Sequence, residues 1–290
     1  MSGFRLGPRE PQRPRGYSWL FAATATVGLV MAAGPVQADP VLPAPLDPTT
    51  AVAQVGPAVV NIDTQMGYAK AVGAGTGIVL DPNGLVLTNN HVISGATQIT
   101  VTAGARQQNY DAEVLGYDRT HDIALLQLRG GTGLTTAVFG DSNTVNVGDP
   151  VVAMGNAGGQ GGTPSAVPGT VVGLNQTVQA SDDLTGDVET LTGMIRASTA
   201  LRPGDSGGPM INAAGQVIGV NTAASANYRM PQQGGEGFAI PINQALAIAN
   251  QIRSGAGTDT VHVGTTPFLG IGVVDGNGGA KVAQVLENTP

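Results

Sequence analysis

Three short segments of the chain carry residue types that together could cleave a peptide or ester bond. They are Thr88–Val92 (TNNHV), Asp122–Leu125 (DIAL) and Gly204–Pro209 (GDSGGP). A serine hydroxyl is a poor nucleophile near neutral pH and needs an adjacent base. Histidine suits that role because its ordinary pKa is ~6.5, and a carboxylate on the other ring nitrogen orients and stabilises the ring. The segments therefore predict Ser206 as nucleophile, His91 as base and Asp122 as orienting acid.

The glycines around Ser206 predict how the negative charge of a tetrahedral intermediate would be stabilised. Glycine allows a sharp turn that leaves backbone N–H groups accessible. We expect the N–H groups of Gly204 and Ser206 to form an oxyanion hole.

Other residues compete for these roles. The chain has 3 histidines; we interpret His121 as a surface residue and place His262 in a linker. Asp111 and Asp118 are rivals for the acid. The chain order His91, Asp122, Ser206 is that of chymotrypsin and differs from that of subtilisin and the α/β-hydrolases.

Two polar stretches favour loops over binding sites. Gly155–Gly162 (GNAGGQGG) is interpreted as a flexible surface loop, because a phosphate-binding loop would end in Gly-Lys-Ser/Thr. Thr177–Thr190 holds acids and turn formers, so we expect a solvated loop. There is no HExxH motif and the histidines lack ligand spacing, so we expect no metal and no cofactor.

The composition excludes several classes of protein. The 290 residues include 44 Gly, no Cys and only 11% charged residues, with a net charge of -7. A zinc ribbon, a disulfide-stabilised mini-protein and a long coiled coil are excluded. The acidic balance argues against a nucleic-acid partner.

The N-terminal region has the pattern of an export signal. Several arginines, from Arg5 to Arg15, precede an apolar run from Trp19 to Ala33, and a small-x-small end follows at Val36–Ala38. This predicts a signal peptide over 1–38, cleaved after Ala38, and thus a secreted or cell-envelope protein; an uncleaved membrane anchor is the alternative. Four prolines in residues 39–50 predict an extended leader.

The rest of the chain predicts an all-β fold with one helix. Short apolar, β-branched runs recur every 8 to 15 residues, which favours a barrel or sandwich. Ile242–Arg253 has an apolar stripe at helical spacing and Gly255 to end it. The expected strands are 55–63, 73–80, 85–88, 99–101, 112–114, 123–128, 151–154, 169–174, 193–197, 209–211, 217–221 and 237–240.

The segments TNNHV, DIALLQL, PGDSGGP and GFAIP resemble those of the HtrA group of trypsin-like serine proteases, most of all the secreted mycobacterial PepA type. The resemblance covers about residues 50 to 290. It implies a chymotrypsin-like double β-barrel over 51–253 and the same roles for His91, Asp122 and Ser206. It also implies the start of a PDZ domain over 266–290, incomplete at the end of this chain. The stretch 254–265 before it is interpreted from its residues as a linker.

The resemblance also assigns a substrate pocket. It places the pocket floor at Ala200, beside Leu201, and the wall at Ala223, Ala224 and Ser225. No acid is present there to bind Arg or Lys, so we expect small aliphatic residues at P1, the substrate residue before the cleaved bond.

One residue departs from the family pattern. Asp205 stands where the family usually has Asn. The sequence leaves open whether it is solvated or pairs with Arg202 or Arg196.

The favoured function is a secreted serine endopeptidase acting on unfolded or extended polypeptides. A proteolytically weak chaperone and an esterase are the alternatives, and a homo-oligomer is compatible with the family.

Overall fold

The structure is a computed structural model of the chain. It describes residue 7 and residues 46–67, 71–103, 107–182, 188–222, 228–229, 235–264, 270–276 and 278–285. The predicted signal peptide, apart from Gly7, and the predicted pocket residues Ala223, Ala224 and Ser225 lie outside these ranges. In the described part, no helix is long and apolar enough to cross a membrane.

The first sheet closes into an antiparallel barrel. Its strands run in the order β5-β4-β1-β2-β3-β6, and β5 also pairs with β6. A further strand, β14, pairs with residues Gly116 to Asp118 of β5, beyond the part of β5 that pairs with β4. The bounds are β1 Val59–Met66, β2 Ala71–Asp81, β3 Leu85–Thr88, β4 Gln98–Ala103, β5 Gln108–Asp118, β6 Ile123–Leu128 and β14 Val261–Val263.

The second sheet closes in the same way. Its order is β8-β7-β10-β11-β13-β9, with β9 also paired to β8, and β12 adds to β8. The predicted all-β, chymotrypsin-like double barrel is confirmed. The bounds are β7 Pro150–Gly155, β8 Ser165–Asp182, β9 Val188–Ala197, β10 Pro209–Asn212, β11 Val217–Thr222, β12 Tyr228–Arg229 and β13 Gly237–Pro241.

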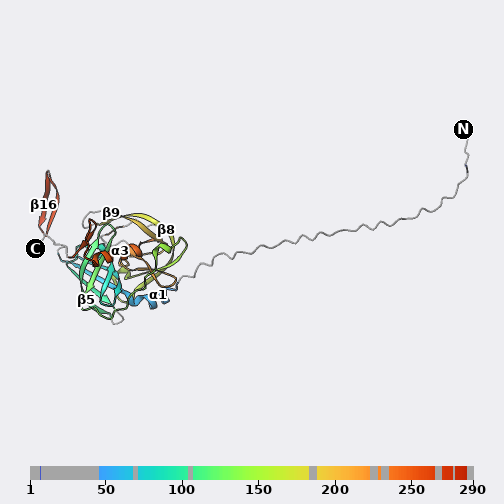
Figure 1. Cartoon of the computed structure of the whole chain (residues 1–290). Helices are drawn as coiled ribbons and strands as arrows, with labels where there is room; N and C mark the ends of the chain where they lie inside the picture. The colour runs from blue at the N-terminus through green and yellow to red at the C-terminus, as the bar shows by residue number, and fades with distance from the viewer. Residues whose placement is uncertain are drawn as a thin grey trace, which may run out of the picture. The chain divides into compact units, whose positions relative to one another are not determined.

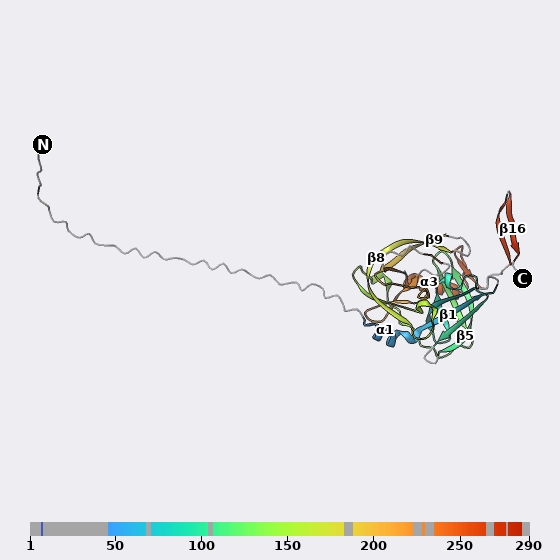
Figure 2. The same ribbon diagram turned by 180° about the vertical axis from the view of Figure 1, so that it is seen from behind.

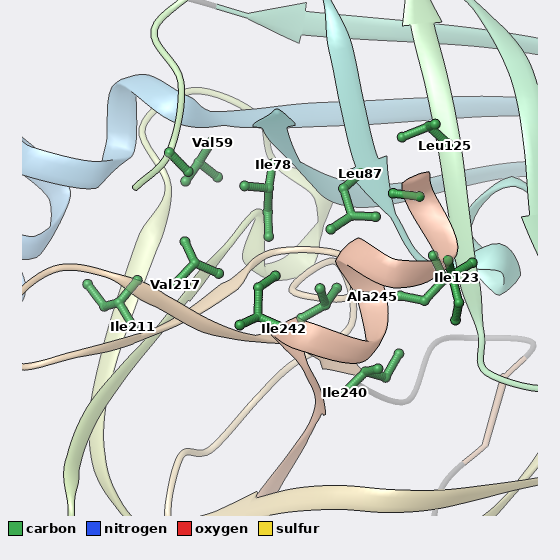
Figure 3. Packing of buried hydrophobic residues seen from close by; sticks show 14 of the residues in the cluster. Val59, Ile78, Leu87, Ile123, Leu125, Ile211, Val217, Ile240, Ile242 and Ala245 are labelled. Carbon is green, nitrogen blue, oxygen red and sulfur yellow. The ribbon is translucent and has the colours of Figure 1, made fainter. Parts of the chain in front are cut away.

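Helix α3 (Ile242–Arg253) has the predicted bounds and joins the two barrels. It contacts β5 and β6 of the first barrel and β11 and β13 of the second, and it lies between the sheets in both views (Figures 1 and 2). Its residues Ile242 and Ala245 are fully buried with Ile78, Leu87 and Val217 in one cluster (Figure 3). One apolar core therefore spans both barrels.

The expectation of an extended leader over 39–50 is wrong for residues 48–50, which begin helix α1 (Pro48–Val55). The Asp47 carboxylate accepts the N–H groups of Thr49 and Thr50, and Pro48 occupies the first turn. An aspartate cap followed by proline is a helix start. Helix α1 takes the first residue of the predicted strand 55–63 and a 3-10 turn takes the next three, so β1 begins at Val59. The shorter helical segments are η1 Gly56–Ala58, α2 Asn90–Ile93, η2 Ser142–Thr144 and η3 Ala157–Gly159.

Two other predictions differ from the structure. The stretch 177–190 is not all loop: β8 continues to Asp182 and β9 begins at Val188. The alternation of Val178 and Ala180 with polar residues buries these two side chains inside the barrel, and period 2 is the strand pattern. Within the predicted linker, Val261–Val263 form β14, with Val261 buried.

Two strands near the C-terminus, β15 (Ile271–Gly276) and β16 (Gly279–Val285), form a separate two-stranded sheet. Residues 265–269, where the predicted PDZ segment begins, lie outside the described residues. The assignment of 266–290 to a PDZ domain stays a prediction.

Candidate active site

A histidine and an aspartate from opposite ends of two strands meet in a two-point contact. His91 lies in α2, directly after β3, and Asp122 precedes β6, which pairs with β3. The His91 Nδ1 lies 2.8 Å from Asp122 Oδ2, and the His91 backbone N–H donates to Oδ1 at 2.9 Å. An ionised carboxylate can only accept, so Nδ1 carries a proton, and in the neutral form of the ring Nε2 has the lone pair. Both side chains are buried, with exposed fractions of 5% and 0%.

The backbone at Asp122 is held in an unusual conformation. Its φ of +53° is in the left-handed region, which Asp tolerates better than most residues. The Asp122 N–H donates to the Arg119 carbonyl at 3.3 Å, and its carbonyl accepts from the Asn89 side chain at 2.8 Å. These contacts fix the direction in which the carboxylate leaves the chain.

Ser206 lies in a turn whose backbone conformation favours glycine at two positions. Gly204 has a φ of +97° and Gly207 a φ of +84°, values that favour glycine. A Cβ on Gly207 would also overlap the Thr76 carbonyl and the Thr88 hydroxyl. Because Thr88 is the last residue of β3, three residues before His91, the turn that carries Ser206 is pressed against the strand end that carries the histidine.

Two carbonyls of this turn accept backbone hydrogen bonds. Each bond fixes the orientation of its peptide group, and with it the direction of the N–H that belongs to the same peptide. The Pro203 carbonyl accepts from the Gly158 N–H at 2.6 Å, and the Asp205 carbonyl accepts from the Gly208 N–H at 3.1 Å. In a trans peptide the C=O and the following N–H point in opposite directions. The N–H groups of Gly204 and Ser206, the predicted oxyanion donors, thus point away from these anchors.

The Asp205 side chain is buried, so it is not solvated. Its oxygens accept from the Arg202 backbone N–H at 2.9 Å and from the Ser165 hydroxyl at 3.3 Å. The Arg196 guanidinium lies 3.6 Å from Glu236 instead. Burial raises the pKa of the Asp205 carboxyl above its ordinary value, and these hydrogen bonds and the charge of Arg202 only partly oppose it.

The other two histidines occupy separate positions. His121, predicted as a surface residue, is one-third exposed and its Nδ1 lies 2.7 Å from Asp118 Oδ2. Asp118, a rival for the catalytic acid, is thereby engaged with a different ring. The other rival, Asp111, is exposed on β5. His262 lies in β14 and its ring stacks on Tyr117 with centroids 5.0 Å apart.

The described pocket residues differ in exposure. Ala200 is exposed. Leu201 is buried and packs with Ala153. No group of three or more His, Asp or Glu residues that could hold a metal ion is found among the described residues.

Sequence reasoning missed the residues that hold the site together. These residues are buried and form hydrogen bonds to residues far away in the sequence: Asn89 bonds to Asp122, and Thr76 bonds to Asn156. The loop Gly155–Gly162, expected to be a flexible surface loop, supplies the N–H that anchors Pro203. This loop directly follows a buried strand, and that position is the local feature that could have indicated its role in the site.

Comparison with known proteins places these residues in a family. The family sequence model of the trypsin-like peptidase domain matches residues 75–220 of this chain. The serine protease PepD of Mycobacterium tuberculosis is 34% identical over 87% of this chain and 57% of its own length. The putative serine protease HhoA of Synechocystis is 34% identical over 77% of this chain and 59% of its own. The chain thus spans less than two thirds of these relatives.

A solved structure agrees with the sequence comparisons. The HtrA-type protease AlgW with a tripeptide superposes with a TM-score of 0.59 at 30% identity, over 82% of this chain and 76% of that one.

Proposed function

Because this chain belongs to the trypsin-like peptidases, and among them to the HtrA-type serine proteases, we propose that it is a serine endopeptidase whose catalytic residues are His91, Asp122 and Ser206. The observation that supports this most is the two-point contact of His91 with the buried Asp122 carboxylate. That contact leaves Nε2 as the ring atom that can accept a proton.

The proposed reaction follows from these roles. His91 Nε2 takes the Ser206 hydroxyl proton as the oxygen attacks the substrate carbonyl, and the N–H groups of Gly204 and Ser206 stabilise the oxyanion. His91 then donates the proton to the leaving amine, which leaves an acyl ester on Ser206. A water molecule, deprotonated by His91, hydrolyses that ester and restores the serine.

The proposed specificity is for small aliphatic P1 residues. Ala200 offers no charge to a basic side chain, and Ala223, Ala224 and Ser225 are small. One methylene contributes only ~1–3 kcal/mol to discrimination, so selectivity should be loose. A peptide-library profile tests this: enrichment of Val, Ala or Leu is expected, and a profile dominated by Arg or Lys would contradict it.

The substrates and location are also proposals. Several relatives are named periplasmic serine endoproteases, and residues 1–38 have an export-signal pattern. We propose an exported enzyme that cleaves unfolded or extended polypeptides and acts without a cofactor, with assembly into a homo-oligomer compatible with the family.

A fluorophosphonate probe and unfolded casein test the proposed function together. The wild-type protein should be labelled at Ser206 and should cleave casein. The matched variant Ser206→Ala should lose both while keeping its thermal transition, because one hydroxyl in a turn contributes little to the core. Labelling without casein cleavage would indicate an esterase. Casein binding without labelling would indicate a chaperone, and casein cleavage by Ser206→Ala would disprove the assignment.

A further inference from the structure

Thr76 bridges the two barrels at the nucleophile turn. It lies in β2 of the first barrel and is completely buried. Its hydroxyl donates to the Gly204 carbonyl at 2.6 Å, and its backbone N–H donates to the Ser206 carbonyl at 2.8 Å. One residue of the first barrel therefore holds both ends of the three-residue segment that contains the nucleophile.

The Thr76 hydroxyl is a hydrogen-bond donor and an acceptor at the same time. Besides donating to Gly204, it accepts the Asn156 backbone N–H at 2.8 Å. A hydroxyl has one donor and two acceptor positions. Asn156 is the second residue of the glycine-rich loop whose Gly158 N–H anchors the Pro203 carbonyl. The hydroxyl therefore ties the turn of Ser206 and the loop that orients Pro203 to one point.

Four successive carbonyls of the turn, from Pro203 to Ser206, are each held by a partner. Gly158 and Gly208 hold the first and third, and Thr76 holds the second and fourth. Thr76 is itself held, since its carbonyl accepts the Thr88 hydroxyl at 2.7 Å, and Thr88 ends the strand that leads to His91. The orientation of each peptide plane in the turn is thus set largely from outside the turn.

We propose that Thr76 is a positioning residue for the oxyanion hole. Its side-chain hydroxyl fixes the Gly204–Asp205 peptide plane, which lies between the two planes that carry the Gly204 and Ser206 N–H groups, and through Asn156 it also holds the loop that anchors the Pro203 carbonyl. This inference rests on the proposed function. Thr76 does not touch the substrate and acts through the turn. A role of this kind affects stabilisation that exists only in the transition state, so kcat should fall while KM stays nearly constant.

The test compares two substitutions that differ in the hydroxyl. Thr76→Val keeps the shape and removes the two hydrogen bonds of the hydroxyl, whereas Thr76→Ser keeps the hydroxyl and removes a methyl group. We expect Thr76→Val to lower kcat about 10- to 100-fold, the range for a misplaced oxyanion donor, with KM within about twofold. Thr76→Ser should stay within about threefold of wild type.

A peptide aldehyde supplies a readout that a general loss of packing would not change. The aldehyde forms a hemiacetal with the serine, and its oxyanion lies where that of the intermediate lies. Thr76→Val should weaken aldehyde binding by about the same factor as kcat. Thr64→Val is the control, because Thr64 is a buried threonine of β1 whose cross-strand partners are Gly73 and Ile99. It should leave both quantities unchanged.

Each result bears on the inference. Unchanged kcat in folded Thr76→Val, or an equal loss in Thr76→Ser, overturns it. If Thr76→Val does not fold, Thr76→Cys replaces it: a thiol is a weak donor, so kcat should fall clearly below that of Thr76→Ser, and equal values overturn the inference. Failure of the wild type to react with the fluorophosphonate at Ser206 is a different result, which removes the proposed function and this inference with it.

Discussion

The part of the chain that the structure describes includes two His–Asp pairs with nearly the same local geometry. In each pair one carboxylate accepts both the backbone N–H and Nδ1 of the histidine. The distances are 2.9 and 2.8 Å for His91–Asp122 and 3.1 and 2.7 Å for His121–Asp118. Both aspartates are buried, but the His121 side chain is 34% exposed and that of His91 only 5%.

The two pairs differ in what surrounds them. His121 and Asp118 are three residues apart in one turn, whereas His91 and Asp122 come from two strand ends 31 residues apart. The nucleophile turn packs against Thr76 and Thr88, next to His91. The two-point contact alone therefore does not identify a catalytic pair. The catalytic role proposed for His91 and Asp122 rests on their place beside the turn that carries Ser206 and on the burial of both side chains.

The largest effect should come from removing the buried ring. We expect His91→Ala to lower kcat about 10⁶-fold, as much as loss of the serine, because nucleophile and base act as one unit. Steady-state hydrolysis of a chromogenic peptide measures it. A loss of less than about 100-fold would mean that another group serves as the base.

Neutralising the carboxylate of the same pair should cost less. Asp122→Asn presents an amide that can donate to Nδ1, which favours the wrong tautomer, and kcat should fall about 10⁴-fold. Single-turnover acylation by an activated ester measures the step directly. Full activity in this variant would show that the carboxylate does not orient the ring, and would reopen the rival assignments to Asp111 and Asp118.

The exposed pair should affect stability more than activity. His121→Ala leaves the buried Asp118 carboxylate with one partner fewer, and an unsatisfied buried group costs about 1–3 kcal/mol. Activity should stay within about threefold, because Arg119 and Asn89 still hold the Asp122 backbone. Urea unfolding and peptide hydrolysis are to be measured on the same preparation. A hundredfold loss of kcat in the folded variant would show that the second pair positions the first.

Asp205 is a third buried carboxylate and can be compared with those of Asp122 and Asp118. It accepts hydrogen bonds from a backbone N–H and a hydroxyl. Its pKa is raised, mainly by burial, so the folded state binds the proton more tightly than the unfolded state. The stability this contributes is full below the unfolded pKa and is lost as the pH rises through the folded pKa. Asp205→Asn should thus raise the free energy of unfolding at pH 7, by roughly 1 kcal/mol.

The gain in Asp205→Asn should shrink in acid, where the wild-type carboxyl is protonated. Unfolding curves of both proteins at pH 7 and pH 4 provide the check. A variant that is less stable than wild type at pH 7, with the difference vanishing at pH 4, would mean that the charged form is stabilised by the fold and would contradict the direction of the pKa shift.

Helices and strands could be predicted where their own residues carry the periodicity and the end signals. Helix α3 and strands β3 and β6 have the expected bounds. These segments combine one clear period with their own start and stop residues. The start of α1 was missed because four prolines suggested an extended chain, although Asp47 and Pro48 are themselves a cap.

The support of the site was not predictable in the same way. The residue types in the three segments predicted the contact of His91 with Asp122. Nothing near Thr76 in the sequence indicates that its hydroxyl meets Gly204, 128 residues away, and nothing near Asp122 predicts a positive φ. Such contacts depend on how two barrels are packed together, which neither period nor local residue preference encodes.

The shared core around α3 has a consequence for how the molecule opens. Leu87 and Ile123 of the first barrel, Val217 of the second, and Ala245 of the helix belong to one cluster, so separating the barrels would expose apolar surface on all three parts. The most protected amides of both barrels should therefore exchange with solvent hydrogen at one common free energy, through global opening. Opening of one barrel alone would then not separate Ser206 from His91, the base proposed for it.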